Sequence, residues 1–441
     1  MKRKTVGMIS LGCDKNRMDS ERLLGFLQDE YEITNDIAQT QILIINTCAF
    51  LESARKESIE TVFSCLPYKK NGKLEKIIMT GCLPQKFIGD IFEELSEVDG
   101  FLGTFDGSLL KQLITDIYAG FRVNYVGKGD ALKCERYLTT PNHYAYLKIA
   151  DGCNNHCTYC LIPKIRGCYK SEKIDDLIDE AKNLGEVKEL ILVAQDTTRY
   201  GVDIYGKPMI VELIRELSSL ENVGGIRLLY CYPELVTDAL IEEFKTNDKL
   251  IKYIDIPLQH ASDRILKLMG RKSTESGNLA LIEKLKETVP DIAIRSTFIA
   301  GFPTESEDDV EILANFLRKA KLFNAGFFAY SREPDTPAYK LDGQLKRGEK
   351  QKRTKYLYKV QNAVMGEILD GFVGKELDVV CDGTDESVTE FFGRAWFSAP
   401  DIDGKIILWS EGLIEQGKTY KVLVKKRRGS DLYGEILYEL T

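Results

Sequence analysis

The chain has 441 residues, enough for roughly two to four domains. Hydrophobic residues make up 44% and charged residues 29%, as in soluble globular proteins. Because no apolar run approaches the ~20 residues that cross a bilayer, we expect no membrane partner. The net charge of −8 disfavours general affinity for nucleic acid. Eleven cysteines without an export signal favour metal or redox use over disulfides, so we expect a cytoplasmic protein.

The first 120 residues alternate strand and helix patterns. Apolar runs rich in β-branched residues occur at TVGMISLG, QILIINT and KIIMTG, and amphipathic helical stretches lie between them, at 20–30 and 52–66 among others. This alternation predicts an open, mostly parallel α/β domain over residues 1–120. Residues 121–138 have weak periodicity and mixed polarity, which predicts a linker.

A second α/β alternation occupies residues 139–371. Six candidate strands are HYAYLKIA, ELILVAQD, GIRLLYC, IKYIDIPLQ, IAIRSTFIAGF and AGFFAYS. Six β/α units are too few for a closed eight-fold barrel, so we expect an open (β/α)6 partial barrel. After a long polar helix at about 345–370, residues 372–441 show short alternating runs broken by glycine, which predicts a small all-β barrel for substrate recognition.

Three cysteines spaced C-x3-C-x2-C follow the first strand of the central domain. Cys153, Cys157 and Cys160 could hold three corners of a 4Fe-4S cube and leave the fourth iron open for a small molecule. The alternative is a zinc knuckle, which needs a fourth ligand, and His156 and Cys168 are both near in the sequence. The C-x3-C spacing is unusual for zinc and favours the iron–sulfur interpretation.

Three further cysteines each follow a predicted strand of the N-terminal domain. Cys13, Cys48 and Cys82 end the segments SLGC, INTC and TGC. Since the carboxyl ends of parallel strands gather along one edge of a sheet, these thiols are expected to meet in space as a second three-cysteine site. The alternative is that they are buried packing residues, because free cysteine often serves as a small hydrophobe.

The chain resembles the methylthiotransferases of the radical S-adenosylmethionine (SAM) superfamily over essentially its whole length. The resemblance rests on SLGCDKNRMDSE, NTCAF, TGCLPQ, GCNNHCTYCLIPKIRG, YIDIPLQHAS and GFPTE. It implies two 4Fe-4S clusters, one carrying sulfur and one that cleaves SAM to a radical, and two SAM molecules for each product. It also implies a C-terminal barrel of the TRAM type and an electron donor such as flavodoxin or ferredoxin.

Several polar residues at the barrel mouth are candidate SAM contacts. The superfamily places an aromatic residue against the adenine of SAM at the position of Tyr159. Residues at the ends of predicted strands face the same mouth: Gln195, Asp196, Gln259 and Arg295. His260 is either a site residue or a satisfied structural histidine, whereas Arg166 and Lys170 are expected in a solvated loop.

Two branches of the family differ in substrate. The segment SLGCDKN resembles the branch that modifies the β-carbon of an aspartate in protein twelve of the small ribosomal subunit, although Asp14 replaces its usual proline. Residues 372–441 carry 9 Lys and Arg against 13 Asp and Glu, and an acidic barrel suits a basic ribosomal protein better than RNA. The alternatives are a methylthiotransferase for adenosine in transfer RNA and a non-catalytic metalloprotein that binds ribosomes. A basic segment at 340–359 could approach ribosomal RNA.

Overall fold

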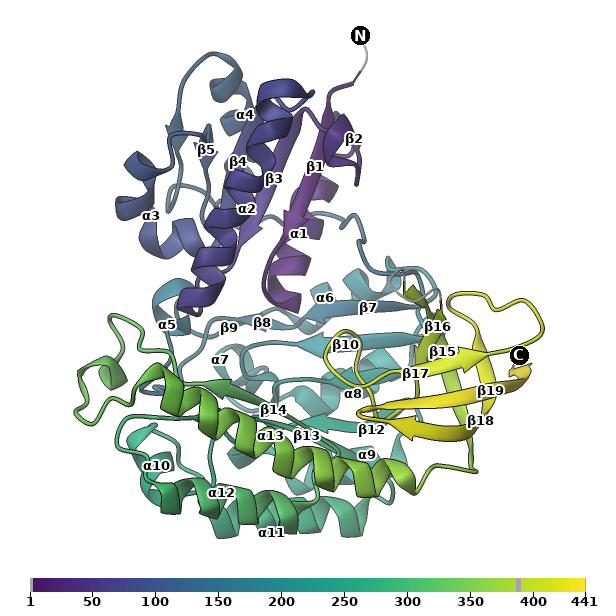
Figure 1. The fold of residues 1–441 in the computed structure, drawn as a ribbon. Helices are drawn as coiled ribbons and strands as arrows, with labels where there is room; N and C mark the ends of the chain where they lie inside the picture. Colours follow the sequence, from purple (N-terminus) through teal and green to yellow (C-terminus); the bar gives the residue numbers. More distant parts are fainter. Residues whose placement is uncertain (1–2, 386–389, 441) are drawn as a thin grey trace.

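The computed structural model describes residues 3–385 and 390–440, which form three parts (Figure 1). The first part is a parallel sheet in the order β2-β1-β3-β4-β5-β6. Its strands are β1 Thr5–Ser10, β2 Glu32–Ile33, β3 Ile42–Thr47, β4 Lys76–Gly81, β5 Gly100–Phe101 and β6 Val123–Asn124. Its helices are α1 Asp14–Leu27, α2 Glu52–Asn71, α3 Cys82–Glu94 and α4 Leu110–Tyr118, with 3-10 turns η1 Ile37–Gln39 and η2 Gly107–Leu109.

The alternation of side chains along β3 explains why this sheet is covered on both faces. Leu43 and Ile45 belong to one apolar core, whereas Ile42 and Ile44 belong to another on the opposite face. A strand buried on both faces typically has a continuous apolar run, here ILII at residues 42–45. Strand β6 lies inside residues 121–138, which the sequence predicts as a linker; two residues are too few to show a periodicity.

The central part is a parallel sheet in the order β14-β13-β12-β11-β10-β7, which confirms the six predicted strands. They span β7 Tyr144–Lys148, β10 Glu189–Val193, β11 Ile226–Leu228, β12 Leu250–Asp255, β13 Ala293–Ala300 and β14 Asn324–Ala329; β8 Ala150–Asp151 pairs with β9 Lys170–Ser171. The helices are α5 Ile162–Ile165, α6 Ile174–Lys182, α7 Val202–Tyr205, α8 Ile210–Ser218, α9 Asp238–Thr246, α10 Asp263–Leu268, α11 Glu275–Thr288, α12 Glu307–Ala320 and α13 Arg347–Asp370. Three 3-10 turns complete it: η3 Thr197–Arg199, η4 Pro233–Leu235 and η5 Pro337–Lys340.

The C-terminal part is a closed antiparallel-rich barrel, as predicted, with strand order β15-β16-β17-β19-β18. Its strands are β15 Glu376–Asp385, β16 Glu390–Arg394, β17 Ile406–Trp409, β18 Thr419–Arg428 and β19 Asp431–Leu440. Along β10, Leu190 and Leu192 pack under the helices, whereas Ile191 and Val193 share a core with the small barrel. The small barrel therefore packs against the inner face of the central sheet. The candidate site lies at the carboxyl ends of the strands of the central sheet.

Candidate functional site

Cys13, Cys48 and Cys82 lie at the carboxyl ends of three adjacent strands, β1, β3 and β4. Cys13 caps the start of α1, and Cys82 is the first residue of α3. Burial is the main cause that raises the pKa of Cys48, and burial raises the pKa of Cys82 to about 12. The structure therefore places all three cysteines at one edge of the sheet, and their role as ligands stays a prediction.

Two glycines and one asparagine pack the loops around these cysteines. Gly12 (φ +94°) has no room for a side chain, since a Cβ there would lie 2.9 Å from the Cβ of Cys48. Gly81 (φ +95°) is tighter still, because a Cβ would lie 2.2 Å from Oδ1 of Asn46. Asn16 donates through Nδ2 to the carbonyls of Leu11 and Thr47, both at 3.0 Å, and so ties the loops after β1 and β3 together.

Cys153, Cys157 and Cys160 lie on one loop between the β8 strand and helix α5. The backbone N–H groups of Asn155 and Ile162 each donate to a cysteine sulfur, Cys153 and Cys160 respectively, at 3.4 Å. Burial raises the pKa of Cys153 to about 11 and that of Cys160 to about 12. Buried thiols facing backbone donors suit ligation, because a metal replaces the proton and N–H···S bonds stabilise the thiolate.

Whether either cysteine set holds a cluster or a single ion stays a prediction. In residues 3–385 and 390–440, no three His, Cys, Asp or Glu side chains are arranged to hold one metal ion. A 4Fe-4S cluster has different requirements, because each cysteine binds a separate iron. The cysteine sulfurs around such a cluster therefore stand farther apart than the ligands of one zinc ion. His156 and Cys168, the candidates for a fourth zinc ligand, are both exposed.

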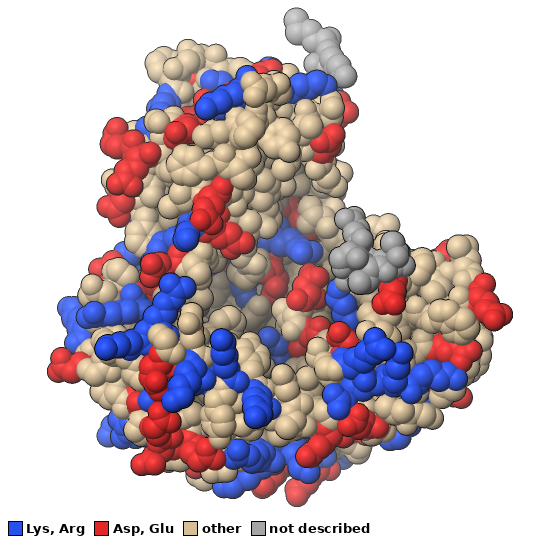
Figure 2. Space-filling model, in the orientation of Figure 1, with Lys and Arg blue, Asp and Glu red and all other residues tan. Residues whose placement is uncertain are grey.

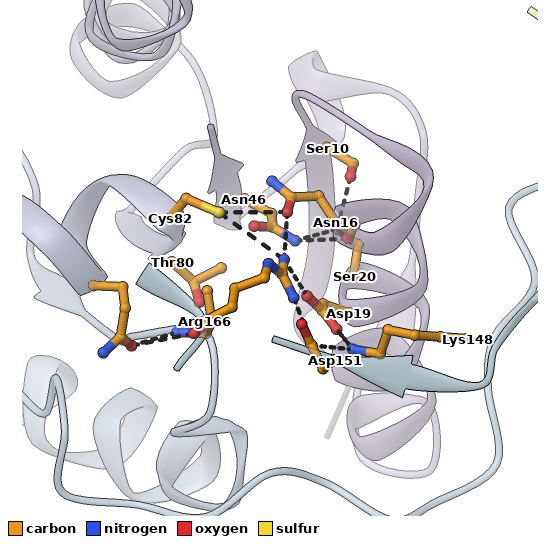
Figure 3. Close-up of polar contacts among 12 residues, drawn as sticks. Ser10, Asn16, Asp19, Ser20, Asn46, Thr80, Cys82, Lys148, Asp151 and Arg166 are labelled. Atoms are coloured by element: carbon orange, nitrogen blue, oxygen red, sulfur yellow. Dashed lines mark hydrogen bonds and ion pairs between the residues drawn. The ribbon is translucent and has the colours of Figure 1, made fainter. Parts of the chain in front are cut away.

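Arg166 connects helix α1 of the N-terminal domain to Asp151 of the central domain (Figure 3). Its guanidinium donates to Asp151 at 2.7 Å, Asp19 at 2.8 Å and Oδ1 of Asn16 at 2.6 Å, and it lies 4.0 Å from the Cys82 sulfur. Burial alone would lower the pKa of Arg166, but Asp151 and Asp19 hold it well above its usual value. The expected solvated position of Arg166 is therefore wrong: only 4% of it is exposed, because two carboxylates from different parts of the chain compensate its charge. Lys170 is exposed, as expected.

The segment after β11 contacts the neighbour of Cys13 in one cysteine set and a sulfur of the other set. The hydroxyl of Tyr230 donates to Asp14 at 2.8 Å, next to Cys13. Two residues later, the hydroxyl of Tyr232 lies 3.7 Å from the sulfur of Cys157. Tyr230 has a φ of +61°, and its backbone N–H donates to Asp255 at 3.0 Å. A bulky residue in this conformation is uncommon and needs such anchors.

Tyr159 and Gln259, two of the predicted SAM contacts, line one apolar pocket of about 190 Å³. The pocket lies at the ends of β13 and β14, and the segment after Cys48 closes it from the N-terminal domain. Its other walls are Phe50, Leu51, Thr297, Ile299, Phe328, Ala329, Tyr330 and Ser331. An apolar pocket with few polar groups is the usual setting for a purine ring. The adenine contact of Tyr159 stays a prediction.

The other predicted SAM contacts already have protein partners. The carboxylate of Asp196 is fully buried and accepts from Asn155 at 2.8 Å, so it supports the cysteine loop. Arg295 donates to Asp255 at 2.9 Å and pairs with Asp403 of the C-terminal barrel at 3.3 Å. Gln195 donates to Asp151 at 3.0 Å, but its buried Oε1 accepts no hydrogen bond from the described residues and remains able to accept one from a ligand.

His260 occupies a structural position. It is fully buried, its Nδ1 accepts from the backbone N–H of Ser262 at 2.9 Å, and its Nε2 lies 3.3 Å from Glu305. The sequence did not predict a site role for the three residues that bind the Arg166 side chain: Asn16, Asp19 and Asp151. Polar residues inside SLGCDKNRMDSE gave a signal for the first two, but their partners are more than a hundred residues away.

Three family models match successive parts of the chain. Residues 5–103 match the Uncharacterized protein family UPF0004, residues 147–317 match the Radical SAM superfamily and residues 373–437 match the TRAM domain. These limits follow the three parts of the fold. Among solved structures, the radical SAM methyltransferase TsrM from Kitasatospora setae superposes with a TM-score of 0.52 at 14% identity, over 77% of each chain, which shows a shared fold.

Two relatives that match over the full length carry the same name. The ribosomal protein uS12 methylthiotransferase RimO of Clostridium botulinum (strain Eklund 17B / Type B) is 45% identical and covers 99% of both chains. RimO of Lachnoclostridium phytofermentans is 44% identical, over 97% of this chain and 99% of its own. Similarity at this level over the whole length includes both cysteine-bearing domains and the C-terminal barrel. The chain therefore belongs to the RimO family of radical-SAM methylthiotransferases.

Proposed function

We propose that this protein transfers a methylthio group to the β-carbon of an aspartate in ribosomal protein uS12. The supporting observation is the pair of cysteine sets, which lie in different domains and are linked by Arg166 and by the segment after β11. The relatives named for uS12 cover the whole chain. Cys153, Cys157 and Cys160 would hold one 4Fe-4S cluster, and Cys13, Cys48 and Cys82 a second. Two SAM molecules would be consumed for each product.

The chemistry explains why two clusters are needed. Acid–base groups cannot remove a proton from an unactivated C–H bond at accessible pKa values. When bound, one cluster with SAM would supply radical chemistry at that carbon, and the other would supply the sulfur. An electron donor of the flavodoxin or ferredoxin kind would provide the reducing equivalent. The protein's own contribution is proximity, since the substrate carbon must reach both centres without diffusing away.

The residues of this chain would carry the positioning. Backbone N–H groups of Asn155 and Ile162 stabilise the thiolates of the radical-generating set. Tyr159 and Gln259 line the pocket for the adenosyl part of SAM. The remaining acceptor of Gln195 would take a donor of SAM or substrate. Arg166 would fix the separation of the two centres, because it bonds to α1 and to Asp151 at once.

Surface charge bears on the substrate. Figure 2 shows a hollow between the N-terminal domain and the central barrel, with Lys and Arg side chains gathered on the same face over α13 and β18. Lys352, Lys355 and Lys359 form an exposed row at helical spacing on α13, and Lys425 and Lys426 are exposed on β18. This basic row suits ribosomal RNA beside the uS12 loop, and it also makes transfer RNA the alternative substrate that an assay must include.

The test is mass spectrometry after anaerobic incubation of the reconstituted protein with SAM, a reductant and either a uS12 loop peptide or unmodified transfer RNA. A methylthio gain on the peptide aspartate supports the proposal. A gain on the RNA alone keeps the chemistry and refutes the substrate. No gain on either refutes the methylthiotransferase mechanism proposed for these residues.

Cysteine variants separate the two clusters. The wild-type chain should hold about eight irons, four for each cluster. Cys157→Ala should abolish SAM cleavage, whereas Cys48→Ala should keep SAM cleavage and lose methylthio transfer. Cys381, buried in the C-terminal barrel, is the matched control: Cys381→Ala should keep all the iron. Normal transfer by Cys48→Ala would rule out the two-cluster arrangement.

A further inference from the structure

Lys15 is a buried lysine without an anionic partner. It follows Cys13 by two residues in the first turn of α1, and only 5% of it is exposed. Two other lysines among the described residues are buried, and both have oxygen partners: Lys148 pairs with Asp151 at 3.0 Å, and Lys350 donates to the carbonyl of Tyr330 at 3.0 Å. Among the described residues, the polar and ring interactions of the Lys15 Nζ consist of one cation–π contact with Tyr230, whose ring centroid lies 3.2 Å away.

An aromatic ring does not replace the hydration that a buried ammonium loses. A cation–π contact is weaker than the cost of leaving a charge without hydrogen-bond acceptors. The nearest carboxylate in the sequence, Asp14, accepts the hydroxyl of Tyr230 at 2.8 Å. In the part of the chain that the structure describes, no carboxylate forms an ion pair with Lys15. Among the described residues, this ammonium therefore has an aromatic contact but no carboxylate partner.

The position of Lys15 indicates which anion could bind to its ammonium group. Tyr230, which holds the ammonium, is anchored in a positive-φ conformation by Asp14 and Asp255. Its segment continues to Tyr232, which lies 3.7 Å from the sulfur of Cys157. Lys15 thus lies between the helix that Cys13 caps and the segment that touches the other cysteine set. An anion bound between these two elements would therefore lie close to both cysteine sets.

We propose that Lys15 binds the side-chain carboxylate of the target aspartate and determines specificity for aspartate over asparagine. The inference rests on the proposed function. The carboxylate carbon of aspartate is bonded directly to its β-carbon, so an ammonium that holds the carboxylate fixes the reacting carbon within one bond. Lys15 is a positioning residue that takes no part in bond breaking. The same chemistry could hold the methionine carboxylate of SAM, and the test distinguishes these sources.

The test is equilibrium binding to the reconstituted full chain, without reductant, so that no turnover is needed. Fluorescence anisotropy would compare a labelled uS12 loop peptide with its Asp→Asn analogue. The wild type should prefer the aspartate peptide by at least about 10-fold, the effect of one charge-assisted hydrogen bond. Lys15→Met should lose that preference by weakening the aspartate peptide alone. Equal binding of both peptides to the wild type would overturn the proposal, even if Lys15→Met failed to fold.

Controls separate a local role from a general loss of structure. Lys111→Met removes a lysine that lies 4.4 Å from the Phe26 ring in the same domain, away from both cysteine sets, and should keep the preference. Lys15→Gln offers a second neutral variant and should behave as Lys15→Met does. A preference that survives in both Lys15 variants refutes the role.

Two further readouts assign the carboxylate and separate this proposal from the previous one. If Lys15→Met weakens SAM binding about 10-fold and leaves the peptide preference intact, the ammonium holds SAM and the proposal is wrong. If the wild type fails to methylthiolate the aspartate peptide, the proposed function fails. If it methylthiolates that peptide and Lys15→Met keeps the preference, only the role of Lys15 is refuted.

Discussion

Replacement of Arg166 by methionine removes the charge that joins the two cysteine-bearing domains. Methionine preserves an apolar side chain of similar length. The negative charges of Asp19 and Asp151 are then balanced by Lys148 alone. Removing one partner of a buried charge pair typically costs about 3–5 kcal/mol. Since Lys148 still contacts both carboxylates, we expect the lower end, about 3 kcal/mol.

Native-state hydrogen exchange measures that loss where it occurs. A loss of about 3 kcal/mol should speed amide exchange about 100-fold in α1 and in the β8–β9 pair. The C-terminal barrel should be unchanged. Methylthio product per SAM cleaved should also fall, because the substrate carbon no longer meets the sulfur centre at a fixed distance.

Two variants make the result interpretable. Arg166→Lys keeps a charge but loses the planar fork that reaches two carboxylates and Asn16, so it should fall between the wild type and methionine. Arg318→Met, which removes an exposed pair with Glu311, should leave exchange unchanged. Wild-type exchange in α1 of Arg166→Met would refute the reasoning.

Three other changes test packing and charge. Gly81→Ala forces a Cβ to 2.2 Å from Asn46 Oδ1 at φ +95°, and it should lower the iron content toward four per chain by iron analysis; Gly89→Ala, with open space around it, should keep the iron. Glu189→Gln leaves the buried Arg227 without its carboxylate partner, and Arg394 then keeps only Asp382. The change should lower the free energy of unfolding by about 3 kcal/mol in urea titration, and an unchanged midpoint would contradict this. The pKa of Glu189 is lowered to about 2, despite burial, by Arg227 and Arg394. The contribution of Glu189 to the free energy of unfolding should be complete above pH ~4.3 and decline as the pH falls toward 2. Unfolding curves of the wild type should show this pH dependence, and those of Glu189→Gln should not.

The sequence predicts those parts of the fold in which local pattern and topology agree. Cys48 follows a strand that begins with the four apolar residues 42–45, and such a run predicts a central strand of a parallel sheet. The carboxyl end of that strand, and so the position of Cys48, followed from this prediction. The six central strands were predictable for the same reason. The two-residue strand β6 was not, because it carries no periodicity of its own and forms only by pairing with β5.

The polar part of the site was less predictable, because each contact joins distant segments. Arg166 looks like a loop residue in IRGCYKS, and only the fold brings it to Asp19, 147 positions earlier. Arg295 reads as a residue of the barrel mouth, yet its partner Asp403 lies in the C-terminal barrel. The local sequence therefore predicts that a charged residue lies at a strand end. It does not predict which distant element packs against that residue.

Apolar packing and charge have different roles at the joint between the two cysteine-bearing domains. Leu161 and Ile165, around and within α5, share a core with Leu83 of α3, so hydrophobic burial holds the domains together. Such burial is non-directional and would tolerate sliding of one domain over the other. Arg166 bonds to fixed oxygens on both sides, so sliding would break several bonds at once. The ionic network thereby restrains the two cysteine-bearing domains against each other, and the proposed reaction, which would pass one carbon between two centres, would depend on that restraint.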